Sequence, residues 1–165
     1  MSTSSFKTNS TASTNTAKRN VKKVPFVELT THQNGNELYY RLQGVVSSGS
    51  DIKRVYVSYF NAKTLDFHCS TNNNRPCGGL GGSPCKHLQS MLKEAVAQYG
   101  LDEVVQFLRV PGDLTSINAE RDILARSGSP ARDAAGDVFS RFLGYLEHLE
   151  QPSSNRPVAG MTWFV

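Results

Sequence analysis

Three cysteines and one histidine lie close together in this chain and constrain its fold more than any other feature. They are Cys69, Cys77, Cys85 and His87. Three thiols and an imidazole form a ligand set that suits tetrahedral Zn²⁺, and four protein ligands fill the coordination shell, as in structural zinc sites. The spacing therefore predicts one structural zinc ion held by these four residues. His68, next to Cys69, is the substitute ligand.

The segment between the first and third cysteines has few side chains that could stabilise it by apolar packing. Residues 71–84, TNNNRPCGGLGGSP, contain five Asn or Pro and four Gly, and they have no periodic apolar face. Metal ligation in zinc-finger peptides contributes about 10–16 kcal/mol of apparent free energy, which is enough to order such a loop. We expect the glycines to let the chain turn tightly around the ion.

The pattern before the cysteines predicts β-strands. Apolar segments at 25–32 and 37–46 flank Asn34-Gly35-Asn36, a sequence typical of a hairpin turn. Two further strands are expected at 53–60 and 65–70, joined by a short polar turn. Because these connections are short, the sheet is predicted to be antiparallel.

The pattern after the cysteines predicts helices. Leu88, Met91, Leu92, Ala95, Val96 and Tyr99 recur at helical spacing, and Gly100 marks the end of that helix. Similar periodicity indicates helices over 101–108, 119–125 and 138–149, the last after a start signal at Ser129-Pro130. The expected fold class is α+β, with an antiparallel β-sheet followed by a zinc knuckle and a helical C-terminal half.

The sequence PCKHL at 84–88 resembles the second half of the SWIM-type zinc finger, whose pattern is C-x-C, a variable gap and C-x-H on a ββα arrangement. The resemblance covers residues 52–99. It implies that Cys85 and His87 form the second ligand pair. The first half departs from the family, because seven residues separate Cys69 from Cys77 where the family has one. The resemblance also implies DNA or protein binding, often as an accessory domain.

Charge is distributed unevenly along the 165 residues. Residues 1–24 hold five of the 18 basic residues and no acidic one, which leaves 13 basic against 14 acidic residues in the remainder. This segment is also rich in Ser, Thr and Asn, so we expect a disordered basic tail. A single domain is predicted over 25–150 and a C-terminal extension over 151–165. The net charge of +4 therefore does not indicate that the folded part binds a polyanion.

The cysteines and the N-terminus bear on the compartment. The cysteine count is odd, and the N-terminus lacks the apolar region of a secretory signal, so we expect reduced thiols and an intracellular, cytoplasmic protein. A nuclear or plastid location stays open, since a Ser-rich, acid-free N-terminus is also typical of transit peptides. No apolar run is long enough to predict a membrane span.

These observations favour a non-enzymatic, zinc-stabilised binding or assembly module that engages a protein partner. The alternative is a nucleic-acid-binding accessory protein that contacts phosphates through the basic tail together with Lys53, Arg54, Arg75 and Lys86. A Cys85/His87 nucleophile pair is disfavoured, because such an enzyme draws its base from elsewhere and needs a cleft. No small-molecule substrate is indicated, and the role of Trp163-Phe164-Val165 stays open.

Overall fold

The computed structural model describes residues 26–34, 36–48 and 54–150 of the chain. The expected tail at 1–24 and the expected extension at 151–165 lie outside the described residues. In chain order the elements are β1 (Phe26–Asn34), β2 (Glu37–Ser47), β3 (Val55–Asn61), β4 (Phe67–Thr71), α1 (Lys86–Tyr99), α2 (Leu101–Leu108), the 3₁₀ turn η1 (Leu114–Ser116), α3 (Glu120–Leu124) and α4 (Ala135–Glu150).

The four strands form one antiparallel sheet in the order β1-β2-β3-β4. β1 and β2 pair in register from Phe26 opposite Val45 to Asn34 opposite Glu37, around the turn that the Asn-Gly-Asn sequence predicted. The pairing of β3 with β4 sets Ser58 opposite Cys69. Residues directly opposite each other in an antiparallel pair point to the same side, so this register decides which side chains share a face of the sheet.

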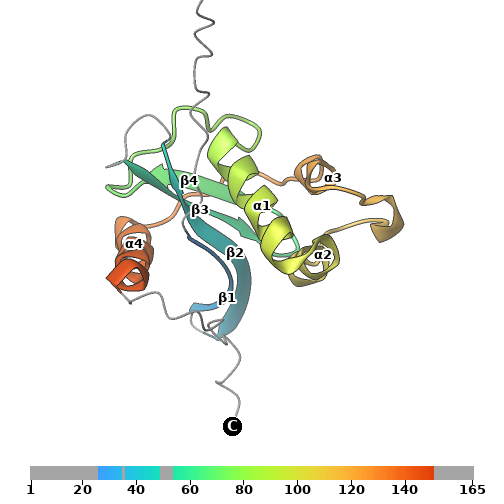
Figure 1. Ribbon diagram of the computed structural model, residues 1–165, viewed down its shortest axis with the longest axis horizontal. Coiled ribbons are helices and arrows are strands. Elements are labelled where there is room, and N and C mark those ends of the chain that lie inside the picture. The colour runs from blue at the N-terminus through green and yellow to red at the C-terminus, as the bar shows by residue number, and fades with distance from the viewer. Residues whose placement is uncertain (1–25, 35, 49–53, 151–165) are drawn as a thin grey trace, which may run out of the picture.

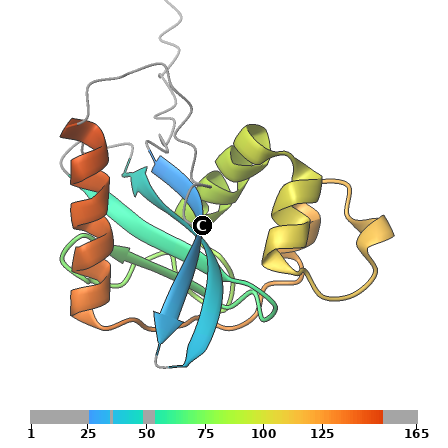
Figure 2. The same cartoon turned by 90° about the horizontal axis from the view of Figure 1, so that it is seen from below.

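Helices cover both faces of the sheet, which confirms the α+β fold. α1 lies across one face with α2 and α3 beside it, and α4 lies on the opposite face (Figure 1). The view from below separates the three layers, with α4 on the left, the sheet in the middle and α1 and α2 on the right (Figure 2). β1, at one end of the described chain, pairs with β2, and α4, at the other end, packs on β2 and β3.

The main core lies between the sheet and α1. Side chains that alternate along the strands meet the apolar stripe of α1, as the predicted periodicity requires. The stripe contributes four side chains with no exposed surface: Leu88, Met91, Leu92 and Ala95. The sheet contributes Leu42, Val46, Phe60, Phe67 and Cys69, all equally buried. The first cysteine is thus part of the core.

A smaller core lies between the sheet and α4. Val45 and Val55 of the sheet pack with Tyr145 and Phe142 of α4. Val138, in the first turns of α4, is also fully buried. The two cores occupy opposite faces because successive residues of a strand point to opposite sides.

The last helix, predicted over 138–149, spans Ala135–Glu150, and its predicted start signal at Ser129-Pro130 lies outside it. In the structure these residues run beside β4: the amide of Phe67 donates to the carbonyl of Ser129 at 3.1 Å, and the amide of Ala131 donates to the carbonyl of Phe67 at 2.7 Å. Pairing with an otherwise open sheet edge satisfies more backbone groups than an early helical turn would. α4 therefore starts at Ala135.

Within the residues that the structure describes, no helix combines the length and apolar character needed to cross a membrane.

Candidate metal centre

The four predicted ligands come from three parts of the fold. Cys69 lies inside β4, Cys77 lies in the loop that follows, Cys85 immediately precedes α1, and His87 is in the first turn of α1. The strand predicted over 65–70 is β4, which ends one residue later, at Thr71, so Cys69 lies within it. The register of β4 turns the Cys69 side chain toward α1, where the other three ligands are.

The ligand atoms converge on one point. Nδ1 of His87 lies 3.3 Å from Sγ of Cys77, 3.8 Å from Sγ of Cys85 and 3.9 Å from Sγ of Cys69. All four ligand atoms lie within 4.8 Å of one another. Around a tetrahedral zinc ion, sulfur and nitrogen ligands are about 3.5 Å apart, given the usual bond lengths. One ring nitrogen cannot hydrogen bond to three sulfurs at once, so the geometry is that of a coordination shell.

Burial and chemistry also fit a metal. The side chains of Cys69, Cys77, Cys85 and His87 are all buried, and the cysteines are free thiols. Thiolate and imidazole are the ligands that structural zinc sites use most, and four of them leave no open position. The donor set therefore fits zinc, and these residues could hold one ion.

The pKa values of the three cysteine thiols are shifted in different directions. Hydrogen bonding to Cys77 and Cys85, together with burial, raises the pKa of the Cys69 thiol. The same hydrogen bonds from Cys69 lower the pKa of Cys77 and of Cys85 below that of an ordinary thiol. Binding of a divalent metal would displace any thiol proton from the cluster, since cysteine coordinates as the thiolate.

Residues of β3 support the cluster from the sheet. The ring of Tyr56 stacks on the imidazole of His87, with ring centroids 3.7 Å apart and an interplanar angle of 17°. Ser58, opposite Cys69, is fully buried; among the described residues its hydroxyl has no well-aligned hydrogen-bond partner, although its interaction with the Cys69 sulfur lowers the pKa of that thiol. A buried hydroxyl without a partner is costly, and a metal-bound thiolate at Cys69 would be an acceptor for it. Sequence analysis missed both residues, because they become neighbours of the site only through strand pairing.

The glycines of the loop do not have the expected role. The glycines with positive φ among the described residues are Gly100 and Gly112, and neither is in the loop. A Cβ added at Gly79 would meet Cys85 at 3.5 Å, an ordinary contact, and at Gly78 it would meet no atom within 4 Å. The loop therefore wraps the cluster without the backbone angles that only glycine tolerates.

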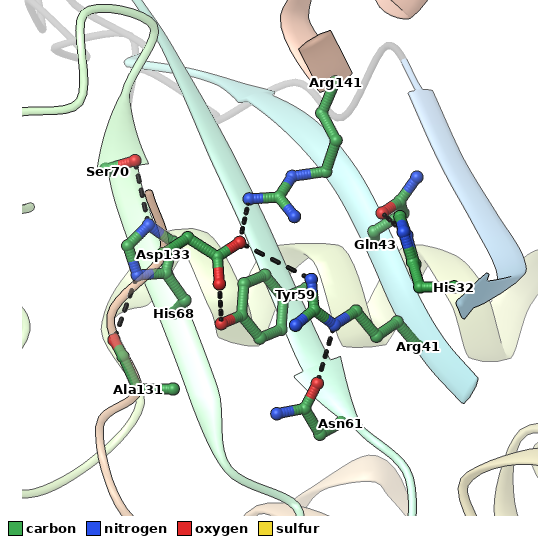
Figure 3. A network of polar contacts seen from close by, with 10 residues as sticks. All are labelled: His32, Arg41, Gln43, Tyr59, Asn61, His68, Ser70, Ala131, Asp133 and Arg141. Carbon is green, nitrogen blue, oxygen red and sulfur yellow. Dashed lines mark hydrogen bonds and ion pairs between the residues drawn. The ribbon is translucent and has the colours of Figure 1, made fainter. Parts of the chain in front are cut away.

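His68 does not belong to the cluster. It is the neighbour of Cys69 in β4, so its side chain points to the α4 face of the sheet. One ring nitrogen contacts the carbonyl of Ala131 at 3.0 Å, and the other contacts the hydroxyl of Ser70 at 3.0 Å (Figure 3). Burial lowers the pKa of His68 and favours the neutral ring. The structure thus leaves Cys77, not His68, as the partner of Cys69.

The α4 face carries a second polar cluster that sequence analysis did not anticipate. Asp133 accepts hydrogen bonds from the hydroxyl of Tyr59 at 2.8 Å and from Arg141, and it lies 3.5 Å from Arg41 (Figure 3). The guanidinium groups of Arg41 and Arg141 lie over the ring of Tyr59, at 4.1 and 5.1 Å from its centroid. The cluster joins β2, β3, the segment before α4, and α4 itself.

Electrostatics explain why this cluster can be buried. Burial opposes ionisation of Asp133, but hydrogen bonds from Arg141 and Tyr59 and the charges of both arginines together lower its pKa. Burial and the neighbouring Asp133 raise the pKa of Tyr59, which stays a neutral donor. The Tyr59 hydroxyl and both guanidinium groups face one carboxylate, so the arrangement fastens α4 to the sheet. Nε of Arg41 donates to Asn61 instead, and the buried Nε of Arg141 has no hydrogen-bond partner among the described residues.

Comparison with known proteins adds no family. No family model, no curated protein and no solved structure matches this chain.

Proposed function

We propose that this chain is a zinc-stabilised, non-enzymatic binding or assembly module whose ligand is a protein partner. The convergence of four buried ligand atoms, three sulfurs and one nitrogen, carries the proposal. The donor set supports one zinc ion per chain. With four protein ligands no position is open for a reacting water, which supports a structural role for the ion.

The zinc would act as a tether between the sheet and α1. Cys69 is fixed in β4, Cys85 and His87 are fixed at the start of α1, and Cys77 comes from the intervening loop. Coordination to all four would close that loop over the end of the sheet. The free energy of ligation would then become folding free energy for this part of the molecule.

A pocket at the cluster supports the binding role. It has a volume of about 450 Å³, and three of the proposed ligands, Cys77, Cys85 and His87, form part of its wall. The rest of the wall includes Tyr56, Pro84, Lys86 and Gln89. Tyr56 also stacks on a proposed ligand, so the metal would fix one wall of the pocket. The resemblance of residues 84–88 to the SWIM-type finger, a family associated with DNA and protein binding, supports a binding role.

Elemental analysis tests the metal. Protein purified without chelator is expected to contain one zinc per chain, and Cys77→Ser is expected to lose most of it because a hydroxyl is a poor zinc ligand. His68→Gln is the matched control and should keep its zinc, since His68 lies on the other face. Zinc far below one equivalent in normally folded protein would contradict the proposal.

Affinity capture from the native source tests the partner. Lys86 borders the pocket and is exposed, and Lys93 is exposed farther along the same helix. Lys86→Glu is expected to abolish capture of the partner, whereas Lys93→Glu should not. Equal capture by both variants would place the partner elsewhere, and capture that needs added nucleic acid would favour the second candidate.

Nucleic-acid binding is the second candidate, and one observation favours it. Residues 67–93 contain Arg75, Lys86 and Lys93 but no acidic residue. Arg54, Arg75 and Lys86 are exposed, while Lys53 lies outside the described residues. The segment that carries the four proposed zinc ligands is therefore basic, although the net charge of the chain beyond residue 24 is almost zero.

A further inference from the structure

The outer face of α4 carries an apolar row that nothing in the described structure covers. Phe139, Leu143 and Leu146 are 53%, 42% and 36% exposed. They are spaced four and three residues apart, so they lie on one side of the helix. We call these three residues the outer row of α4.

The outer row adjoins the part of α4 that packs on the sheet. Val138, Phe142 and Tyr145 face the sheet, and each precedes or follows a member of the outer row by one residue. The apolar arc of α4 is thus wider than the sheet covers. A helix with apolar side chains well beyond its buried face is typical of a helix with a further contact.

We propose that the outer row of α4 is the docking surface for residues 158–165 of the same chain, VAGMTWFV. This segment follows α4 in the sequence and lies outside the described residues. Five of its eight residues have large apolar side chains: Val158, Met161, Trp163, Phe164 and Val165. Docking would remove these side chains and the outer row from water together.

The connection is long enough. From Phe139 to Leu146 the outer row spans eight residues of helix, a rise of about 10 Å. Residues 151–157 separate the end of α4 from the proposed docking segment, and seven residues can span up to about 23 Å. So short a tether gives residues 158–165 an effective concentration in the millimolar range at the outer row, which allows a small apolar contact to form.

Charge favours this occupant over a second copy of α4. The exposed charged side chains described on α4 are Asp137 and Glu147, whereas Arg141 is buried against Asp133. Of these two, Glu147 directly follows Leu146 and borders the outer row, whereas Asp137 lies about 200° around the helix from Phe139. Pairing two copies through the row would place a Glu147 from each copy at its border, with no opposite charge among the described side chains there. Residues 151–165 contain Arg156 and no acidic residue, so their charge complements that of the helix.

Trp163 reports the docking, because it is the only tryptophan of the chain. In the full-length protein its fluorescence should be blue-shifted, and less accessible to a soluble quencher, than in the same protein unfolded in denaturant. Leu143→Glu should reverse both effects, since loss of one leucine contact lowers the docking equilibrium constant about tenfold or more. Leu114→Glu is the matched control, because Leu114 is 49% exposed in η1 and should leave the emission unchanged.

Other outcomes would overturn the proposal. Circular dichroism and zinc content verify that each variant is folded, and Leu146→Gln replaces Leu143→Glu if the latter is not. An emission that matches unfolded protein, or one that neither outer-row variant changes, means that the segment does not dock there. A blue shift that disappears on dilution, with a fall in molar mass, means that the row binds a second copy instead.

Discussion

At the scale of single residues, Ser58 and Asp133 show how each face of the sheet handles buried polar groups. Ser58 is fully buried opposite Cys69, and among the described residues its hydroxyl has no well-aligned hydrogen-bond partner. Asp133 is buried with three donors around one carboxylate. The Ser58 hydroxyl lacks a well-aligned acceptor, whereas the Asp133 carboxylate is satisfied, although the buried Nε of Arg141 beside it has no hydrogen-bond partner among the described residues.

Ser58→Ala is expected to weaken zinc binding about tenfold, because outer-shell hydrogen bonds to metal ligands typically have effects of that size. Competition with a chromophoric chelator measures the affinity. Ser70→Ala is the matched control: Ser70 is equally buried in the same sheet, but it bonds to His68 on the other face. Equal zinc affinity in wild type and Ser58→Ala would show that Ser58 does not support the cluster.

Asp133→Asn is expected to destabilise the protein by about 3 kcal/mol at neutral pH, because it leaves two arginines without their carboxylate. Denaturant unfolding measures this, with the exposed Asp102→Asn as control. The pKa of Asp133 is lowered in the folded state, so its contribution is present above the unfolded pKa, about 3.9, and disappears as pH falls through the folded value. A stability difference that is the same at neutral and strongly acidic pH would refute this account.

At the scale of elements, the loop between β4 and α1 depends on the cluster more than any helix does. Its glycines lack positive φ and its surface is mostly exposed, although Leu80 packs against the main core. α4 has its own anchors in Tyr145 and in the Arg141–Asp133 pair. Loss of one ligand should therefore affect these elements differently.

Cys85→Ala is expected to remove hydrogen-exchange protection from residues 71–84 and the start of α1, while much of α2 and α4 keeps theirs. The loop loses the ligation that orders it, whereas those helices retain their packing. Mass spectrometry of exchanged peptides locates the change. Unchanged protection across residues 65–90 would mean that packing, including that of Leu80, holds the loop without metal.

At the scale of the whole molecule, the proposed zinc site and the charged cluster lie on opposite faces of one sheet. The basic residues of the N-terminal segment are a third component, separate in sequence from both. Because salt-sensitive attraction to phosphates depends on clustered positive charge, the tail can dominate non-specific binding even if the folded part binds a protein.

Deletion of residues 1–24 is expected to leave the melting temperature nearly unchanged and to remove most salt-sensitive affinity for DNA or RNA. The deleted residues carry a charge of +5 and almost no large apolar side chains. Thermal unfolding and salt titrations of nucleic-acid binding measure the two effects. Tight binding by the truncated protein, with a steep salt dependence, would favour nucleic acid over a protein partner as the main ligand.

The sequence by itself determined the local elements and the ligand set. Apolar alternation predicted the strands, helical spacing with Gly100 predicted α1, and cysteine spacing predicted Cys69, Cys77, Cys85 and His87. These features are local, since each rests on side-chain period, turn chemistry or a compact motif. The structure brings all four ligands together, whereas the resemblance to the SWIM-type finger stays a prediction.

Only the tertiary structure decided what surrounds these features. Strand register turned Cys69 toward α1 and His68 away from it, and it set Ser58 beside the cluster. Chain folding brought Asp133 to Tyr59, 74 residues away in sequence, and left one row of α4 exposed. Such contacts join residues that are distant along the chain, so no local period encodes them. A shift of one residue in register would exchange the two faces, which is why the sheet had to be seen before either cluster could be assigned.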